Sequence, residues 1–366
     1  MQFRCLNRSF RSHILTDTAT TKLHTPRSIR RYLDDHIVGQ ETVKKRLSVA
    51  VYNHYLRVHA NVEAEKSNVL ILGPSGSGKT LIARETTKLL KVPFSFNDAT
   101  PFTQAGYVGD DVESCIARLL QKSDFDVDLA QKGIVFIDEI DKLARKSSTS
   151  LNRDVGGEGV QQSFLKLLEG TQVELSMKVG RGAHTQKFKV DTTDILFVCS
   201  GAFAGIDSVI QKRLGAAHSG SDVLRKCEPD DIINYGFIPE FVGRIPVIVH
   251  TDPLSTMDMV DILTGPPNSV VKQFQRAFRA SGIDLVFHHE SLIRIAEMAV
   301  RKETGARELR RIIENILQTA QYEYPGSDVK YLVVMPDCIE GAPLSAFRDG
   351  EEKEAIEALE TTCLCF

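Results

Sequence analysis

The sequence predicts an α/β fold, in which a large domain with a parallel sheet is followed by a small α+β domain. Between residues 68 and 250, apolar runs alternate with helical patterns, which is typical of parallel strands joined by helices. A glycine-rich motif lies between the first apolar run and the helical pattern that follows it. Beyond residue 252, helical patterns enclose two short apolar runs, Leu285–Phe287 and Tyr331–Met335, which indicates a smaller second unit. We expect a large domain at 26–252, a small domain at 253–338 and a tail at 339–366.

Residues 1–25 have the composition of a targeting segment. The first sixteen positions contain three arginines and no acidic residue, and their apolar residues recur at helical spacing. A helix here would have one apolar and one cationic face, as mitochondrial presequences do. The residues concerned are Arg4, Arg8 and Arg11, with Phe3, Leu6, Phe10 and Ile14 on the apolar face. We expect a presequence that directs the protein to the mitochondrial matrix, with a chloroplast presequence or a disordered basic arm as alternatives.

A phosphate-binding motif follows the first predicted strand, Asn68–Leu72. Residues 73–80 are Gly-Pro-Ser-Gly-Ser-Gly-Lys-Thr, a full match to G-x-x-x-x-G-K-[ST]. The glycines allow the backbone to curl so that its N–H groups face an anion. We expect Lys79 to contact the β- and γ-phosphates of ATP and the Thr80 hydroxyl to hold Mg²⁺. The predicted nucleotide contacts are Gly73, Pro74, Ser75, Gly76, Ser77, Gly78, Lys79, Thr80 and Leu81.

The second predicted strand, within Gly133–Asp141, ends in carboxylates. Ligands bind at the carboxyl ends of parallel strands, so Asp138 is placed to hold Mg²⁺ and Glu139 to orient and deprotonate the attacking water. We therefore predict that Glu139 and Lys79 are catalytic. A glutamate directly after the metal-binding carboxylate favours ATP hydrolysis over ATP binding alone. The third strand, Ile195–Ser200, ends in a serine that is either a sensor of the γ-phosphate or the plain end of a strand.

Charge and hydropathy exclude several classes of partner. The net charge of −3 and the pI near 6.4 give no general attraction to nucleic acid or to an anionic membrane. No apolar run approaches the ~18 residues that a membrane-spanning helix needs. The seven cysteines include no C-x-x-C pair, so the sequence predicts neither a zinc module nor a disulfide framework. We expect a reducing compartment and no nucleic-acid or membrane partner.

Further motifs lie between and around the two nucleotide motifs. They are Ile37-Val-Gly-Gln40, Ala105–Glu113 with its Gly-Tyr-Val-Gly core, Gly156–Gln161, Ile238–Pro246 and Thr304-Gly-Ala-Arg307. Together with the nucleotide motifs they closely resemble the ClpX family of AAA+ protein unfoldases, from about residue 26 to residue 340. Each motif alone would also fit an ordinary surface loop, and it is their order and combination that are specific.

The resemblance implies an AAA+ large domain, an AAA+ lid and ATP hydrolysis at the subunit interfaces of a homo-oligomeric ring, which we expect to be a hexamer. Its substrates would be proteins, gripped in an axial pore by the aromatic side chain of Tyr107. Arg244 would be a catalytic arginine finger that neutralises charge on a neighbouring subunit's phosphoryl group, and Arg307 would be a second sensor. The remaining implied residues are Gly106, Val108 and Gly109 in the pore loop and Val38, Gly39 and Gln40 beside the adenine.

The chain departs from the family in three segments. Members of that family usually carry an N-terminal four-cysteine zinc domain, whereas about 25 residues with one cysteine precede the matched region here. The stretch Arg213–Leu224 lacks the Ile-Gly-Phe-like tip that docks on the ClpP peptidase, and Ala216 offers no hydrophobic anchor. Gly180–His184 keeps the Arg and His of a basic pore-loop cluster but not its lysine. Selection of acidic tags is therefore altered, unless Lys178 and Lys187 restore the positive charge.

We expect an ATP-dependent unfoldase that acts without ClpP. The alternative is an ATPase subunit that delivers substrates to a ClpP- or HslV-type peptidase. HslU itself is disfavoured, because the span from Asp141 to Ile195 is too short for its inserted domain. A nucleic-acid AAA+ motor would need a basic channel or a DNA-binding module, and neither the charge balance nor the C-terminal region offers one.

Overall fold

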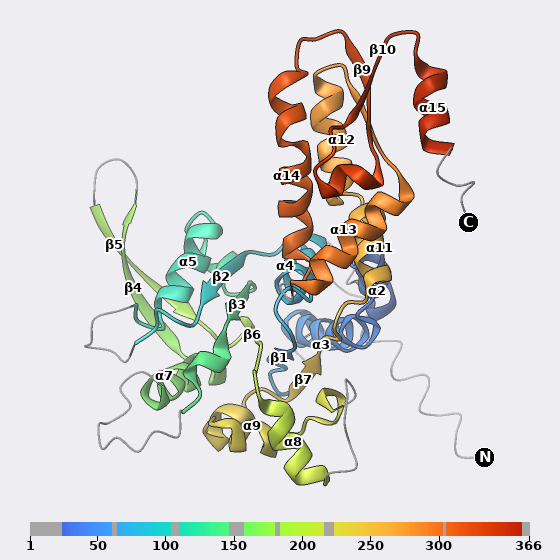
Figure 1. Ribbon diagram of the computed structural model, residues 1–366. Helices are drawn as coiled ribbons and strands as arrows, with labels where there is room; N and C mark the ends of the chain where they lie inside the picture. Colours follow the sequence, from blue (N-terminus) through green and yellow to red (C-terminus); the bar gives the residue numbers. More distant parts are fainter. Residues whose placement is uncertain are drawn as a thin grey trace, which may run out of the picture.

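The computed structural model describes residues 24–60, 64–103, 110–145, 157–179, 184–215, 223–302 and 305–360. In this part of the chain a large α/β domain is joined to a smaller domain that lies above it in Figure 1. The expected α/β fold, with a parallel sheet and a small α+β domain, is confirmed. Most of the expected presequence, residues 1–23, lies outside the described residues. Among the described residues, no helix combines the length and the apolar character needed to cross a membrane.

The large domain is built on a five-stranded sheet whose neighbouring strands are all parallel. The strand order is β2-β3-β6-β1-β7, which places β1 between β6 and β7. Parallel strands end at the same edge, so the polar residues that follow β1, β3 and β6 meet there. The strands are β1 (Val69–Leu72), β2 (Phe94–Asp98), β3 (Ile134–Asp138), β6 (Leu196–Gly201) and β7 (Val247–His250).

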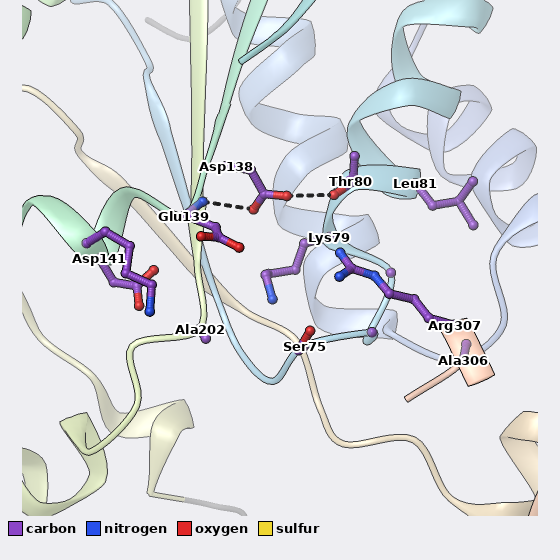
Figure 2. Close-up of a pocket in the computed structure, with 13 residues that line it drawn as sticks. Ser75, Lys79, Thr80, Leu81, Asp138, Glu139, Asp141, Ala202, Ala306 and Arg307 are labelled. Carbon is purple, nitrogen blue, oxygen red and sulfur yellow. Dashed lines mark hydrogen bonds between the residues drawn. The ribbon is translucent and has the colours of Figure 1, made fainter. Parts of the chain in front are cut away.

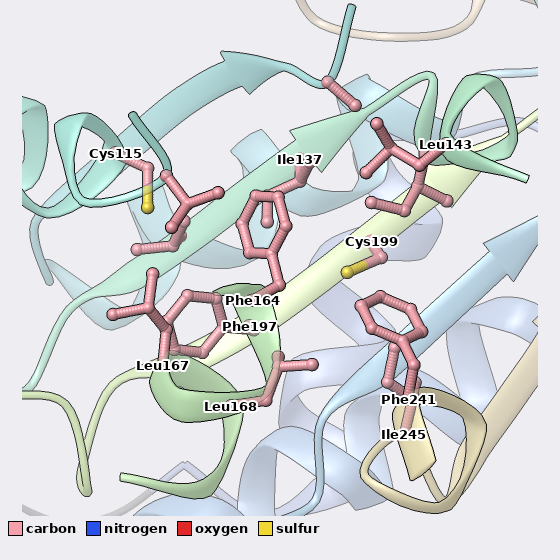
Figure 3. Close-up of a cluster of buried hydrophobic side chains, with 14 of the residues drawn as sticks. Cys115, Ile137, Leu143, Phe164, Leu167, Leu168, Phe197, Cys199, Phe241 and Ile245 are labelled. Carbon is pink, nitrogen blue, oxygen red and sulfur yellow. The ribbon is translucent and has the colours of Figure 1, made fainter. Parts of the chain in front are cut away.

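The two faces of this sheet bury separate apolar clusters. Val135 and Ile137 of β3 belong to the cluster that Figure 3 shows in part, whereas Ile134 and Phe136 belong to the cluster on the opposite face. Because both faces are buried, the strands are continuous apolar runs rather than alternating patterns. This is the signal by which the sequence reveals them.

Helices cover both faces of the sheet (Figure 1). The cluster in Figure 3 is completed by helical side chains such as Cys115, Phe164 and Phe241. The opposite cluster is completed by the two N-terminal helices, through residues such as Leu33 and Leu47. The helical elements are α2 (Pro26–His36), α3 (Glu41–Ala60), α4 (Lys79–Leu90), α5 (Ser114–Lys122), α6 (Val127–Ala130), η1 (Ile140–Leu143), α7 (Glu158–Glu169), α8 (Ile206–Leu214), η2 (Leu224–Lys226), α9 (Pro229–Tyr235) and α10 (Pro239–Gly243).

An antiparallel hairpin of β4 (Gln172–Val179) and β5 (His184–Asp191) projects from the large domain (Figure 1). The sequence analysis did not predict it. Ser176 pairs with Lys187 and Lys178 pairs with Thr185, so Lys178 and Lys187 lie on the same face of the hairpin. The two lysines are therefore diagonal neighbours on this face, beside the ion pair of Glu174 and Lys189.

The small domain packs helices on a three-stranded sheet of order β10-β9-β8 around a core of its own. Strand β10 pairs antiparallel with β9, although residues 339–366 were expected to be a tail. The sequence does not reveal this strand because its residues alternate between half-buried and exposed, which gives only a weak apolar signal. The elements are α11 (Thr256–Thr264), α12 (Val270–Ala280), β8 (Asp284–Phe287), α13 (His289–Arg301), α14 (Arg307–Glu323), β9 (Val329–Val334), η3 (Pro336–Glu340), β10 (Ser345–Arg348) and α15 (Glu352–Glu360).

Candidate functional site

A cavity of about 480 Å³ lies at the carboxyl ends of the central strands, beside the first turn of α4. Figure 2 shows that side chains from β3, α4 and the start of α14 face it together. The structure thus brings residues from both domains to one place. Its lining residues are Ser75, Gly76, Gly78, Lys79, Thr80, Leu81, Asp138, Glu139, Asp141, Lys142, Ala202, Ala306 and Arg307.

The loop before α4 has the backbone that an anion site requires. Gly73, Gly76 and Gly78 have φ values of 144°, 73° and 96°, which side-chain-bearing residues rarely adopt. At Gly73 a Cβ would lie only 2.8 Å from the backbone oxygen of Thr251, so the close approach also demands glycine. The loop then leads into the N-terminus of a twelve-residue helix, where free N–H groups and the helix dipole favour negative charge. This geometry suits the phosphates of a nucleotide.

Lys79 is held inside this loop. Its Nζ donates to the backbone oxygens of Gly73, at 2.8 Å, and Pro74, at 2.9 Å. Burial lowers the pKa of Lys79, the positive charge of Arg307 lowers it further, and the carboxylate of Asp138 opposes both. An ammonium that has lost part of its hydration and lies among backbone carbonyls is well placed to exchange these partners for phosphate oxygens.

Asp138 is oriented through both of its carboxylate oxygens. Oδ2 accepts a hydrogen bond from Thr80 Oγ1 at 3.1 Å, and Oδ1 accepts from the Glu139 N–H at 3.0 Å (Figure 2). The Ser200 hydroxyl also donates to Oδ1, at 2.5 Å. Ser200 is buried, and the hydrogen bond of its hydroxyl is to Asp138. The sequence had left it as a γ-phosphate sensor or a plain strand end, and neither reading included this contact.

Glu139 has a strained backbone, with φ 55° and ψ 33° in the left-handed region that non-glycine residues seldom occupy. Its Oε2 accepts a hydrogen bond from Thr100 Oγ1 at 3.3 Å. The strain turns the chain sharply after β3, so the carboxylate faces the cavity (Figure 2). Strain of about 1–3 kcal/mol is typical of residues held in position at functional sites.

The oxygen donors in this cavity fit Mg²⁺. Mg²⁺ prefers hard oxygen ligands, and commonly takes one or two from the protein and the others from phosphates and water. The hydroxyl of Thr80 and the carboxylate of Asp138 lie in direct contact and supply such a pair. Among the described residues, no group of three or more His, Cys, Asp or Glu could hold a metal ion without other ligands. The fit is therefore to a metal that arrives with a phosphate ligand.

A second cavity, of about 360 Å³, continues from the same loop between the two domains. Its walls are largely apolar and include Ile37, Val38, Leu254 and Ile262. Of the three residues expected beside the adenine, Val38 lines this cavity. Gln40 instead uses its amide to bond the backbone N–H and C=O of Asp252, both at 2.8 Å. Gln40 thus ties the start of α3 to the segment that links the domains, and Gly39 is next to it.

The small domain contacts the phosphate loop directly. The Ala306 N–H donates to the backbone oxygen of Gly76 at 3.3 Å. Gly305 lies so close that a Cβ there would be 2.8 Å from the Gly76 Cα and from the Ser75 oxygen. This contact carries Arg307, the first residue of α14, into the cavity lining (Figure 2). The position of Arg307 therefore depends on how the two domains are docked.

Arg244 is not part of this cavity in the same chain. It follows α10, and its Nε donates to Glu169 Oε1 at 2.8 Å. The predicted pore-loop residues Gly106, Tyr107, Val108 and Gly109 lie outside the described residues.

Among the residues that the sequence analysis missed, two bear directly on the chemistry of the site. Asp141 lines the cavity, and its Oδ1 is buried without a hydrogen-bond partner among the described residues. Thr100 contacts Glu139 from the loop after β2. Asp141 could have been found from the Asp-Glu-Ile-Asp order, whereas Thr100 follows a strand that was not predicted.

Two segments of the chain match known domain families. Residues 64–248 match the AAA domain of the Cdc48 subfamily, and residues 254–327 match the C-terminal, D2-small domain of ClpB protein. The first range covers the large domain from β1 into β7 without α2 and α3, and the two ranges together contain every residue that lines the first cavity.

The chain is also similar to curated bacterial proteins named ATP-dependent Clp protease ATP-binding subunit ClpX. The protein from Borrelia duttonii is 43% identical over 344 residues, which is 88% of this chain and 80% of that protein. The one from Treponema denticola is 44% identical, over 82% of this chain and 77% of the relative. The one named ClpX 2 from Wolinella succinogenes is 46% identical, over 84% of this chain and 79% of the relative.

Proposed function

Since the chain belongs to the ClpX family of AAA+ ATPases, we propose that it is a protein unfoldase that works as a homo-oligomeric ring, a hexamer, and threads protein substrates through an axial pore. The family resemblance in the sequence is confirmed by these relatives, and with it the assignment as an ATPase. The observation that best supports the proposal is the single cavity that brings together Lys79, Asp138, Glu139 and Arg307.

ATP would occupy both cavities of the site. The loop from Gly73 to Gly78 would hold the phosphates with its backbone N–H groups, and Lys79 would contact the β- and γ-phosphates. The apolar cavity beside Val38 would take the adenine, because a flat base loses little by leaving water for apolar walls. Thr80 and Asp138 would hold Mg²⁺, which, when bound, would neutralise charge on the phosphate oxygens.

Glu139 is the candidate general base for hydrolysis. Its carboxylate faces the same cavity as Lys79, so a water between Glu139 and the γ-phosphate would be oriented for in-line attack and would lose its proton to the carboxylate. The Thr100 hydroxyl, 3.3 Å from Oε2, limits the rotation of this carboxylate. Replacement by glutamine keeps the shape and removes the base. We expect Glu139→Gln to bind ATP while turnover falls by about 10²-fold or more.

Arg244 is proposed to complete the site of a neighbouring subunit. It precedes β7, near the amino ends of the strands, whereas the phosphate loop follows the carboxyl end of β1. The four residues of β1 alone span roughly 13 Å at about 3.3 Å per residue. Arg244 and the phosphate loop therefore lie at opposite ends of the parallel strands. An arginine in that place serves a second subunit in a head-to-tail contact, and such contacts close into rings.

Substrate handling is proposed to involve Tyr107 and the hairpin of β4 and β5. The hairpin projects from the large domain (Figure 1). Its strand register places Lys178 and Lys187 on one face. This arrangement favours the reading in which the two lysines compensate for the lysine missing from Gly180–His184. A weakly basic pore would attract acidic segments without reading their sequence.

The test of this function is the ATP-dependent unfolding of a stably folded fluorescent client. Unfolding is measured as the loss of the client's fluorescence. Wild-type protein is expected to unfold the client, and Glu139→Gln is not. Tyr107→Ala is expected to keep its ATPase rate within about twofold while losing unfolding. If Tyr107→Ala unfolds the client at the wild-type rate, the assignment of the pore residue is wrong.

We further propose that the protein acts without ClpP. The docking stretch Arg213–Leu224 has no aliphatic-Gly-Phe tip in its sequence, and residues 216–222 of it lie outside the described residues. Delivery of substrates to a ClpP- or HslV-type peptidase is the alternative. ATP-dependent co-purification of a ClpP-type peptidase with Glu139→Gln would favour that alternative and refute independence from ClpP.

The mitochondrial matrix is the proposed location, supported by the arginine-rich and acid-free composition of residues 1–16. A fluorescent fusion to this segment should enter mitochondria. Replacing its three arginines with glutamine should abolish import, and import that survives the change would contradict the proposal.

A further inference from the structure

The guanidinium of Arg244 is held by a single contact that leaves its outer end accessible. Only Nε donates to Glu169, at 2.8 Å, and within the part of the chain that the structure describes neither terminal nitrogen has a partner. A carboxylate that masked an arginine would take two parallel hydrogen bonds, including at least one from a terminal nitrogen. Here the side chain is 56% exposed, and its terminal nitrogens, which can form a two-pronged contact with a phosphate, are not used by Glu169. Glu169 thus restrains the guanidinium through its Nε side and makes no hydrogen bond to its terminal nitrogens.

The backbone under this ion pair is fixed by one buried side chain. Asn68 Nδ2 donates to the backbone oxygen of Arg244 at 2.9 Å and lies 3.4 Å from the oxygen of Leu168, the neighbour of Glu169. Asn68 Oδ1 accepts from the Phe197 N–H at 3.3 Å. Asn68 is 1% exposed, so its amide has no water to exchange with. Asn68 therefore ties the end of α7 and the backbone of Arg244 to the central strands.

The place of Glu169 in its own helix is unfavourable. Glu169 is the last residue of α7, and a negative charge at the C-terminus of a helix opposes the helix dipole. Nothing in the helix itself explains a carboxylate there. The contact with Arg244 supplies a reason, because the guanidinium offsets the repulsion from the helix end.

We propose that Glu169 is a positioning residue for Arg244, so that it controls ATP hydrolysis in the neighbouring subunit and not in its own. The proposal rests on the proposed function, in which Arg244 acts across the subunit interface. The two side chains are 56% and 45% exposed, so the pair is weak and Glu169 does not hold the fold together. Its role is to keep the terminal nitrogens directed at an incoming phosphate, since a misplacement of about 1 Å can cost up to 10²-fold in rate.

The first experiment separates rate from binding. Glu169→Ala should lower kcat for ATP by about threefold to tenfold and leave KM within about twofold, because the arginine acts on the transition state. Glu169→Gln keeps an oxygen that accepts from Nε–H and should recover most of the lost rate. Glu314→Ala is the matched control: Glu314 is also half-exposed and paired with an arginine, at 3.1 Å, but lies in the small domain. It should have wild-type kinetics.

The second experiment tests action across the interface with mixed rings. Glu139→Gln subunits do not hydrolyse ATP but present a correctly held Arg244. When they are added in excess to Glu169→Ala subunits, turnover per Glu169→Ala subunit should rise severalfold towards the wild-type value. A parallel mixture of Arg244→Ala with Glu139→Gln tests the premise that Arg244 itself acts in trans.

The outcomes are distinguishable. A rise in turnover per hydrolysing subunit in both mixtures supports the proposal. A rise with Arg244→Ala but not with Glu169→Ala overturns the role of Glu169 and leaves the proposed function intact. If neither mixture rises, the trans role of Arg244 fails and the inference fails with it. Wild-type kcat in Glu169→Ala alone would also overturn it.

Discussion

Replacing Gly305 with alanine should disconnect the lid from the phosphate loop while leaving both domains folded. Gly305 has a φ of +67°, and a Cβ there would lie 2.8 Å from the Gly76 Cα and the Ser75 oxygen. Ordinary contact begins at 3.4 Å, so the lid must withdraw by about 0.6 Å. The neighbours are backbone atoms and cannot rotate away. The hydrogen bond from Ala306 to Gly76, already 3.3 Å long, should be lost.

The magnitude follows from two separable terms. Alanine in the left-handed region costs about 1–2 kcal/mol wherever it occurs. Displacement of the lid by roughly half an ångström moves Arg307 in the cavity, and we expect kcat/KM for ATP to fall by about tenfold. Gly282→Ala is the matched control, since Gly282 has φ +78° in the same domain and no atom within 4 Å of its Cβ position. It should show the loss of stability without the loss of activity.

The assay is steady-state ATP hydrolysis together with thermal unfolding of both variants. Gly305→Ala should have low activity and a Tm close to that of Gly282→Ala. If Gly305→Ala hydrolyses ATP as Gly282→Ala does, the contact between the lid and the phosphate loop does not position Arg307, and the reasoning is refuted.

Three other changes have defined outcomes. Arg307→Ala should raise KM for ATP or lower kcat by about tenfold without changing Tm, since the side chain is exposed at the start of α14; unchanged kinetics would remove it from the site. Ser200→Ala removes the hydroxyl bonded to Asp138 Oδ1, so the Mg²⁺ concentration that gives half-maximal turnover should rise severalfold. ATP binding in the absence of metal should be unchanged and serves as the control. Burial lowers the pKa of His54 to about 3, aided by the charge of Arg57, whereas an unfolded histidine titrates near 6.5. The unfolded state therefore binds more protons between these values, and the free energy of unfolding should fall by about 1.4 kcal/mol per pH unit below 6.5; His54→Leu should lose this slope, and an equal slope in both proteins would contradict the assignment.

The parts of the site that the sequence predicted are those with local signals. The glycine loop, Lys79 and Thr80 are contiguous, and Asp138 and Glu139 directly follow a buried strand, so one motif fixes each group. Their meeting in one cavity follows from the parallel sheet, because strands that run together end together. The order of the large and small domains could also be predicted, because the pattern of apolar runs changes after residue 252.

The parts that escaped prediction depend on contacts between distant residues. Asn68 was treated as the start of a strand, and only the fold shows that its amide joins Arg244 to the end of α7. The contact of Ser200 with Asp138 crosses from β6 to β3 and has no local signature. The hairpin of β4 and β5 does alternate apolar and polar residues, so it could have been found.

The dependence of ATPase activity on assembly tests the central claim most directly. Turnover per subunit should be measured as a function of protein concentration with ATP and Mg²⁺, with the particle mass determined on the same samples. The account predicts that turnover rises as a ring forms and then levels off, because Arg244 must enter a neighbour's site. A monomer that hydrolyses ATP at a rate per subunit independent of concentration would contradict it.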